Sequence, residues 1–152
     1  MEKKETVLVL GATGNLGAYS ALALKQAGFN VIAAGKRISD NGFFAQHGIA
    51  YYSVDLTVEH SLDALLDKEI SIVADFAGEL PSRCAYNPQA LVRTIPEATL
   101  NVLEFMRAVG AKKSYFQQHH MICFNTMNPE FRLIQMLCGH FRLRGIIASM
   151  QS

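Results

Sequence analysis

The segment Gly11–Gly17 constrains the fold more than any other feature of the sequence. Its three glycines stand at every third position of Gly-Ala-Thr-Gly-Asn-Leu-Gly, directly after the apolar run Thr6–Leu10. A continuous, partly β-branched apolar run is typical of a central parallel strand that is covered on both faces. From Asn15 to Ala27 apolar residues recur at helical spacing, and Gly28 follows as a helix stop. The segment therefore joins a buried strand to a helix.

Each glycine of this loop has a separate physical role. The first allows a tight turn out of the strand, the second lets the backbone approach a pyrophosphate, and the third lets the helix pack close to the strand. Backbone N–H groups at the helix N-terminus then face the phosphates, helped by the helix dipole. We expect the loop to bind the ADP portion of NAD or NADP; the alternative is a glycine turn with no ligand. The expected contacts are Gly11, Thr13, Gly14, Asn15, Leu16 and Gly17.

Strands and helices alternate along the chain after this loop. The expected strands cover Val31–Ala34, Ile49–Val54 and Ile70–Phe76. A short helix is expected over Ser61–Asp67 with Ser61 as its N-cap, and another within residues 87–109 that closes at Gly110. This alternation predicts an α/β fold, a Rossmann-type doubly wound parallel sheet in a three-layer α/β/α arrangement.

The regular pattern fails after Lys113. The architecture requires a fifth buried strand there, but the chain continues Ser-Tyr-Phe-Gln-Gln-His-His, and the remaining residues show no convincing period. We therefore expect a dinucleotide-binding domain over residues 1–113, incomplete at its C-terminal side. Residues 114–152 are expected to form an atypical tail with no substrate domain. Such a tail leaves an exposed hydrophobic edge, which favours a homodimer or aggregation.

The residues at the end of the second strand are expected to determine whether the protein prefers NAD or NADP. An acidic residue there hydrogen-bonds the ribose 2′-hydroxyl, whereas a basic one suits a 2′-phosphate. The sequence has Lys36 and Arg37 at this point, with no acidic residue before Asp40. Both favour NADP, and Arg37 more strongly, because its guanidinium can bind phosphate through two N–H groups. The alternative is a solvated basic turn.

Two further strand ends complete the candidate site. Asp55 and Leu56 follow the third strand, on the edge where the adenine would lie. Asp55 is expected either to accept a hydrogen bond from the adenine amino group or to cap the turn toward Ser61. Ala77 and Gly78 end the fourth strand with small residues, which would let the middle of the cofactor pass closely. Ordinary strand-end turn chemistry explains the same pair.

Composition excludes several other functions. The formal net charge of +1 gives no reason to expect a nucleic acid or an anionic membrane as partner, and the apolar runs are too short to span a bilayer. We therefore expect a cytoplasmic protein. The three cysteines form no C-x-x-C pair, so neither a disulfide framework nor a common zinc site is implied. Four metal-capable residues of the tail fit no common zinc spacing either, and we expect no metal: His120, Cys123, Cys138 and His140.

The sequence resembles the extended short-chain dehydrogenase/reductase superfamily, in its NAD(P)-dependent epimerase/dehydratase group. The resemblance reaches about Lys113 and implies a Rossmann domain followed by a smaller substrate domain. It also implies hydride transfer to and from nicotinamide, commonly on nucleotide sugars. In this resemblance the glycine loop, Asp55-Leu56 and Ala77-Gly78 are cofactor contacts. The segments that carry it are Val7–Gly17, Val54–Leu56, Asp75–Gly78, Ala98–Glu104 and Gly110–Lys113.

The sequence departs from the pattern of that family at the catalytic residues. None of the five tyrosines is followed four places on by lysine, the pair in which lysine lowers the pKa of a catalytic tyrosine. The Ser or Thr after the fifth strand has no clear counterpart. The resemblance thus supports a truncated oxidoreductase-family chain that binds NAD(P) without most of the catalytic apparatus. Two alternatives stay open, a non-catalytic NAD(P)-sensing regulatory module and the residual product of a decayed gene.

The irregular tail has one further explanation, a change of reading frame after about Lys112. If the codons of residues 113–130 are read one base earlier, they permit a buried strand followed by Ser-Thr-Thr, where the family keeps its catalytic hydroxyl. Adjacent A-rich codons for Lys112 and Lys113 are a natural place for such a slip. Codons that forbid the shifted peptide would contradict this hypothesis.

Overall fold

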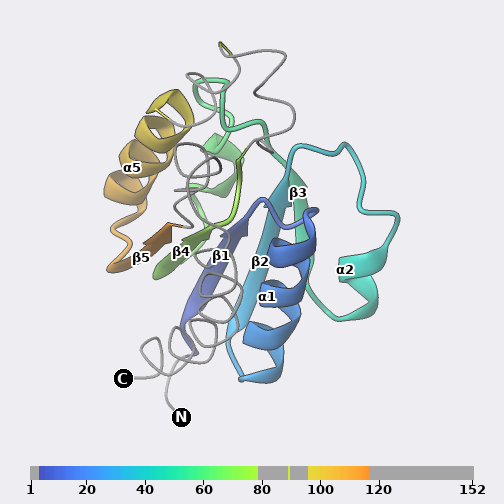
Figure 1. The fold of residues 1–152 in the computed structure, drawn as a ribbon. Coiled ribbons are helices and arrows are strands. Elements are labelled where there is room, and N and C mark those ends of the chain that lie inside the picture. Colours follow the sequence, from blue (N-terminus) through green and yellow to red (C-terminus); the bar gives the residue numbers. More distant parts are fainter. Residues whose placement is uncertain (1–3, 79–88, 90–95, 117–152) are drawn as a thin grey trace, which may run out of the picture. The chain divides into compact units, whose positions relative to one another are not determined.

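Parallel strands in the order β3-β2-β1-β4-β5 form the centre of the structure (Figure 1). The computed structural model describes residues 4–78, 89 and 96–116, which belong to one unit, Met1–Gln117. Every neighbouring pair of strands is parallel, so the predicted Rossmann-type sheet is confirmed. The strands are β1 (Thr6–Leu10), β2 (Asn30–Gly35), β3 (Ala50–Ser53), β4 (Ile72–Asp75) and β5 (Lys113–Phe116).

The central strand β1 is buried along its whole length, as the apolar run predicted. Successive side chains of a strand point to opposite faces of the sheet. Leu8 and Leu10 join the core cluster that includes Val102 and Phe105 of helix α5 (Ala98–Val109). Val7 and Val9 are buried as well but lie outside that cluster. They therefore face the other side of the sheet, where helix α1 packs.

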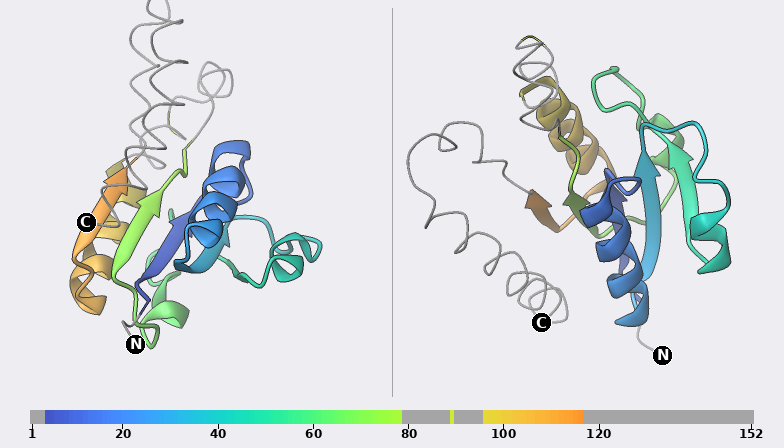
Figure 2. Two further views of the ribbon diagram at one scale, coloured as in Figure 1. Left: turned by 90° about the horizontal axis from the view of Figure 1, so that it is seen from below. Right: turned by 45° about the vertical axis from the view of Figure 1, so that its right-hand side comes forward.

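Helix α1 (Asn15–Gln26) contacts β1 and β2 (Figure 1). Its buried residues recur at helical spacing, and its C-cap Ala27 is followed by Gly28 with a φ of 96°, so the predicted helix and its stop are confirmed. Helices α1 and α5 thus cover opposite faces, and the three-layer arrangement is visible in Figure 2. The buried residues of α1 are Gly17, Ser20, Ala21 and Leu24.

The connection between β3 and β4 differs from the prediction. Instead of a helix over Ser61–Asp67, a single 3₁₀ turn, η1, covers Asp63–Leu65 with Leu62 as its N-cap. Among the described residues, the buried hydroxyl of Ser61 has no hydrogen-bond partner, so the predicted Ser61 cap is wrong. The physical reason is that His60 takes a left-handed φ of 62°, and its carbonyl accepts the N–H of Asp63. This turn directs the chain into the 3₁₀ element two residues after Ser61.

A fifth strand is present where the sequence analysis found none. Strand β5 pairs with β4 in parallel from Lys113 to Phe116. Its first two residues are exposed and the last two are half-buried, which explains the absence of an apolar run. Phe116 packs against the core cluster, and the ring of Tyr115 lies 5.7 Å from that of Phe76. A strand held by backbone pairing needs few apolar side chains, because its ladder bonds do not depend on side-chain type.

The last predicted helix corresponds to α5. It ends at Val109, and Gly110 follows with a φ of 67°, as the glycine stop predicted. Residues 87, 88 and 90–95 of the predicted range lie outside the described residues, as does the tail from 117 onward with its His and Cys residues. Where the chain is described, none of its helices combines the length and apolar character that a membrane crossing requires. A short helix, α2 (Phe43–Gln46), connects β2 to β3 along the chain.

Candidate dinucleotide-binding site

The candidate residues follow the carboxyl ends of four parallel strands and so gather at one edge of the sheet. From β1 the chain turns outward to β2 and β3, and it then returns to place β4 on the other side of β1. The direction of winding therefore reverses between β1 and β4. In open α/β sheets the crevice outside the carboxyl ends at this reversal is where ligands bind. The ends that meet there are Leu10 of β1 and Asp75 of β4, which are paired in register.

The glycine loop makes its turn between these two strand ends. Gly11 has a φ of 69°, and a Cβ at this position would lie 2.6 Å from the backbone nitrogen of Ala77. The loop is further held by hydrogen bonds from the N–H of Ala12 to the carbonyl of Ala34, 2.9 Å, and from the N–H of Gly14 to the carbonyl of Gly11, 3.0 Å. At Gly17 a Cβ would strike the Gly11 carbonyl. The tight turn and the close helix approach predicted for the first and third glycines are confirmed.

The N-terminus of α1 has the properties of an anion site. Its first helical hydrogen bond runs from the N–H of Ala18 to the carbonyl of Gly14, 2.9 Å. The N–H groups of Asn15, Leu16 and Gly17 therefore precede the helical ladder. No side chain caps this end, and no acidic residue stands in the first turn. These donors and the helix dipole fit a pyrophosphate.

Thr13 connects the loop to the end of β2. A Cβ at Gly35 would lie 2.9 Å from the hydroxyl oxygen of Thr13 and 3.3 Å from that of Tyr51. The side chain of Thr13 thus lies against the buried Gly35, where a larger residue would displace it. The structure gives Thr13 this packing role beside the cofactor contact predicted for it.

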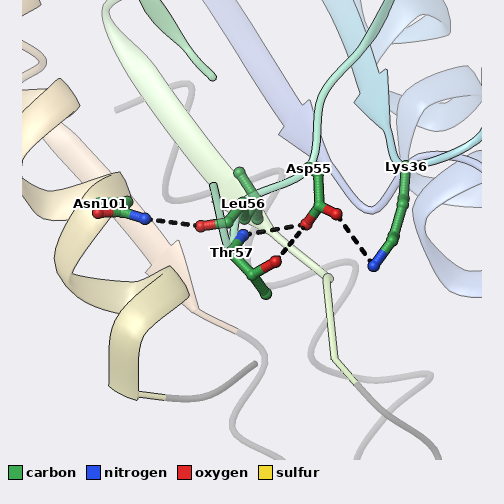
Figure 3. Close-up of polar contacts among 5 residues, drawn as sticks. All are labelled: Lys36, Asp55, Leu56, Thr57 and Asn101. Atoms are coloured by element: carbon green, nitrogen blue, oxygen red, sulfur yellow. Dashed lines mark hydrogen bonds and ion pairs between the residues drawn. The ribbon is translucent and has the colours of Figure 1, made fainter. Parts of the chain in front are cut away.

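An ion pair joins the ends of β2 and β3 (Figure 3). The ammonium of Lys36 lies 3.0 Å from Oδ2 of Asp55. Oδ1 of Asp55 accepts hydrogen bonds from the hydroxyl of Thr57, 2.7 Å, and from its N–H, 3.1 Å. Burial raises the pKa of Asp55, but the hydrogen bonds from Thr57 and Lys36 and the charge of Lys36 outweigh it and hold that pKa below its ordinary value. Asp55 therefore stays ionised and fixes the local turn, the second of its predicted roles.

Sequence analysis missed Asn101, which holds the same loop from helix α5. Its amide donates a hydrogen bond of 2.8 Å to the carbonyl of Leu56 (Figure 3). The side chain of Leu56 is buried in the core cluster. Leu56 therefore anchors the loop inward, while Asp55 remains half-exposed beside it. The sequence carries no local signal for this contact, because the partners are 45 residues apart.

Asp75 is a buried carboxyl at the reversal point, and sequence analysis assigned it no chemistry. It is 7% exposed, and Oδ1 accepts a hydrogen bond of 2.8 Å from the N–H of Ala77. Burial raises the pKa of Asp75 to about 6, although the hydrogen bond from Ala77 lowers it. The side chain thereby shapes the Ala77-Gly78 turn on which the glycine loop rests. The carboxyl is an acid that titrates near neutral pH.

The fold, the glycine turn and the open helix N-terminus define a protein with a Rossmann-type α/β fold. More particularly, the chain belongs to the NAD dependent epimerase/dehydratase family, whose model matches residues 7–118. The predicted family is confirmed. No curated protein sequence matches the chain at a significant level.

Solved structures with the same fold include two sugar-nucleotide epimerases and a dehydrogenase. The UDP-glucose 4-epimerase of Bifidobacterium longum, in complex with NAD+ and UDP, is 22% identical with a TM-score of 0.69 over 80% of this chain. The UDP-glucose-4-epimerase of Stenotrophomonas maltophila, with bound NAD and formylated UDP-arabinopyranose, is 17% identical with a TM-score of 0.65 over 75%. The GalE-like L-threonine dehydrogenase of Cupriavidus necator is 23% identical with a TM-score of 0.62 over 72%. The chain spans only 38%, 36% and 35% of these proteins respectively.

The contact between Gly11 and Ala77 predicts a large loss of stability in Gly11→Ala. Alanine would have to adopt a left-handed φ and also displace the Ala77 backbone, which together cost about 2–5 kcal/mol. Gly42→Ala is the matched control: Gly42 has a φ of 76° and no heavy atom within 4 Å of its would-be Cβ, so only the strain of about 1–2 kcal/mol applies. Urea unfolding of both variants measures the difference, and equal losses would contradict the contact.

The raised pKa of Asp75 predicts that the free energy of unfolding falls as the pH rises through the range in which this carboxyl titrates. Because its pKa is raised on folding, from 3.8 to about 6, its contribution is complete below pH 3.8 and is lost as the pH passes 6. Asp75→Asn keeps an acceptor for Ala77 but cannot ionise. The difference in free energy of unfolding, variant minus unmodified protein, should therefore increase by about 3 kcal/mol from acid to neutral pH. Glu104→Gln, which removes an exposed carboxylate, is the control, and a pH-independent difference for Asp75→Asn would reject the assignment.

Proposed function

We propose that this chain binds NAD(P), with the pyrophosphate on the Gly11–Gly17 loop and the N-terminus of α1. Two observations carry the proposal: a glycine turn without room for a side chain at Gly11, and a helix N-terminus with no side-chain cap and no acidic residue in its first turn. Membership of an NAD-dependent family supports it, as does the NAD bound to two structures of the same fold. The proposed contacts are Gly11, Thr13, Gly14, Asn15, Leu16, Gly17, Lys36, Arg37, Asp55, Leu56, Ala77 and Gly78.

Within this site we assign the adenosine end to the turns after β2 and β3. Asp55 would accept a hydrogen bond from the adenine amino group at Oδ2, which Lys36 occupies only in part. Ala77 and Gly78 would lie beneath the middle of the cofactor. A pyrophosphate bound beside Ala77 and Gly78 would lie near the buried carboxyl of Asp75. Its negative charge would repel the ionised carboxylate and so favour the protonated form of Asp75.

The basic residues after β2 support NADP over NAD. The Lys36 ammonium is paired with Asp55, although its side chain is 73% exposed, and a surface pair of this kind is weak. The side chain of Arg37 is exposed, and a guanidinium can bind phosphate through two N–H groups. We therefore assign the 2′-phosphate chiefly to Arg37, with Lys36 adding positive charge nearby.

We propose cofactor binding without turnover by the residues of this sequence, because it contains no Tyr-x-x-x-Lys pair. Hydride transfer on a nucleotide sugar is the activity that the family resemblance suggests for relatives that carry the Tyr-x-x-x-Lys pair. A non-catalytic NAD(P)-sensing module is the second candidate, since the same loop serves it equally well. The frame change after about Lys112, the domain limits 1–113 and 114–152, cytoplasmic location and a homodimer also remain proposals. The coding DNA tests the first of them.

Titration with NADPH and NADH tests the proposed function directly. Nicotinamide fluorescence and the melting temperature should both rise on binding, with NADPH bound more tightly. Arg37→Ala should weaken NADPH binding by about 10- to 100-fold, the usual value of a charged hydrogen-bond pair, and leave NADH binding nearly unchanged.

Arg107→Ala, at an exposed arginine in the last turn of α5, is the matched control and should bind both cofactors as the unmodified protein does. If neither dinucleotide binds, the proposed function is rejected. Binding of both with equal affinity, insensitive to Arg37→Ala, would instead remove only the assignment of the 2′-phosphate.

A further inference from the structure

Tyr51 of β3 is held rigidly beside the end of β2. Its ring stacks on that of Phe44 in α2, with centroids 5.8 Å apart and an interplanar angle of 8°. Phe44 is itself 1% exposed, so this stack fixes one face of the tyrosine ring. The phenol is thereby pointed at the strand end that precedes Lys36 and Arg37.

The hydroxyl of Tyr51 closes the turn that carries the two basic residues. It lies 2.6 Å from the carbonyl oxygen of Arg37 and 3.0 Å from that of Gly35, as a donor shared between the two. These carbonyls flank Lys36 on both sides. A single side-chain group therefore fixes the backbone of the whole Gly35–Arg37 segment.

Asp40 fixes the far end of the segment that leads from β2 to α2, and its charge acts on the Tyr51 hydroxyl. Asp40 accepts hydrogen bonds from the N–H groups of Phe44, 2.7 Å, and Gly42, 3.2 Å, and so anchors the chain where it enters α2. Burial, and secondly the charge of Asp40, raise the pKa of Tyr51, while the charge of Arg37 lowers it. The phenol keeps its proton and remains a donor. The segment between β2 and α2 is thus fixed at both ends.

The same point touches the phosphate loop. The hydroxyls of Tyr51 and Thr13 both lie close to Gly35, where an added Cβ would come within 3.3 Å of the first and 2.9 Å of the second. Displacing the Tyr51 hydroxyl therefore changes the turn after β2, on the side that faces the loop. Tyr51 would influence the turn in this way without contacting the phosphates of the dinucleotide.

We propose that Tyr51 is a positioning residue that sets the preference for a 2′-phosphorylated dinucleotide. By holding the Arg37 carbonyl it fixes the direction from which the guanidinium leaves the backbone, so less freedom is lost when the phosphate binds. This inference rests on the proposed function. It assigns specificity to a side chain that is 14 residues from Arg37 in sequence and for which no cofactor contact is proposed.

The test is Tyr51→Phe, which keeps the stacked ring and removes only the hydroxyl. We expect the dissociation constant of NADPH to rise about threefold to tenfold, the usual effect of one hydrogen bond, and that of NADH to change less than twofold. Tyr52→Phe removes the hydroxyl of the adjacent tyrosine, on the opposite face of β3, and should change neither.

A double-mutant cycle separates positioning from general support of the fold. Combined with Arg37→Ala, the Tyr51→Phe change should cause no further loss of NADPH affinity. Equal losses for NADH and NADPH, or a full effect without Arg37, would overturn the inference while leaving the proposed function intact. Failure of the unmodified protein to bind either dinucleotide would reject the proposed function and this inference together.

Discussion

The contact between the backbones of Gly11 and Ala77 is the constraint on which the rest of the site depends. It joins the ends of β1 and β4, the two strands between which the winding of the sheet reverses. A side chain at Gly11 would separate these ends. The phosphate loop would then leave β1 at a different angle, and α1 would lose its approach to the Gly11 carbonyl. One absent methyl group therefore fixes a turn and a helix position.

The electrostatics of the site follow from this geometry. The helix donors favour negative charge at the loop, and the lysine and arginine after β2 extend that preference toward the proposed adenosine end. Asp55 is compatible with it because Lys36 and Thr57 satisfy its charge. Asp75 has no such charged partner contributing to its pKa among the described residues. Burial therefore pushes this carboxyl toward its neutral form, the form that an approaching pyrophosphate tolerates best.

The sequence was informative where a structural role depends on neighbours in the chain. Strand β1, helix α1 and the stop at Gly28 follow from a period and a glycine, and all were predicted. Strand β5 was not predicted, because it is defined by its pairing with β4. The 3₁₀ turn between β3 and β4 was not predicted either, because the left-handed φ of His60 determines where it begins. The contacts of Asn101 and Tyr51 could not be read from any local pattern, since each joins elements distant in sequence.

The turn after β2 shows why residue type alone is an incomplete guide to specificity. Lysine and arginine predict a phosphate site, but the structure pairs the lysine with Asp55 and ties the carbonyl of the arginine to Tyr51. The two cations are therefore unequal. Both side chains are exposed, but Lys36 is paired with the carboxylate of Asp55. Arg37 instead has its backbone carbonyl fixed by Tyr51. A guanidinium presented from an anchored carbonyl binds a phosphate with less loss of freedom than one on a loose loop. In the proposed site, selectivity would thus depend on the residues that hold the turn as well as on the charges that it carries.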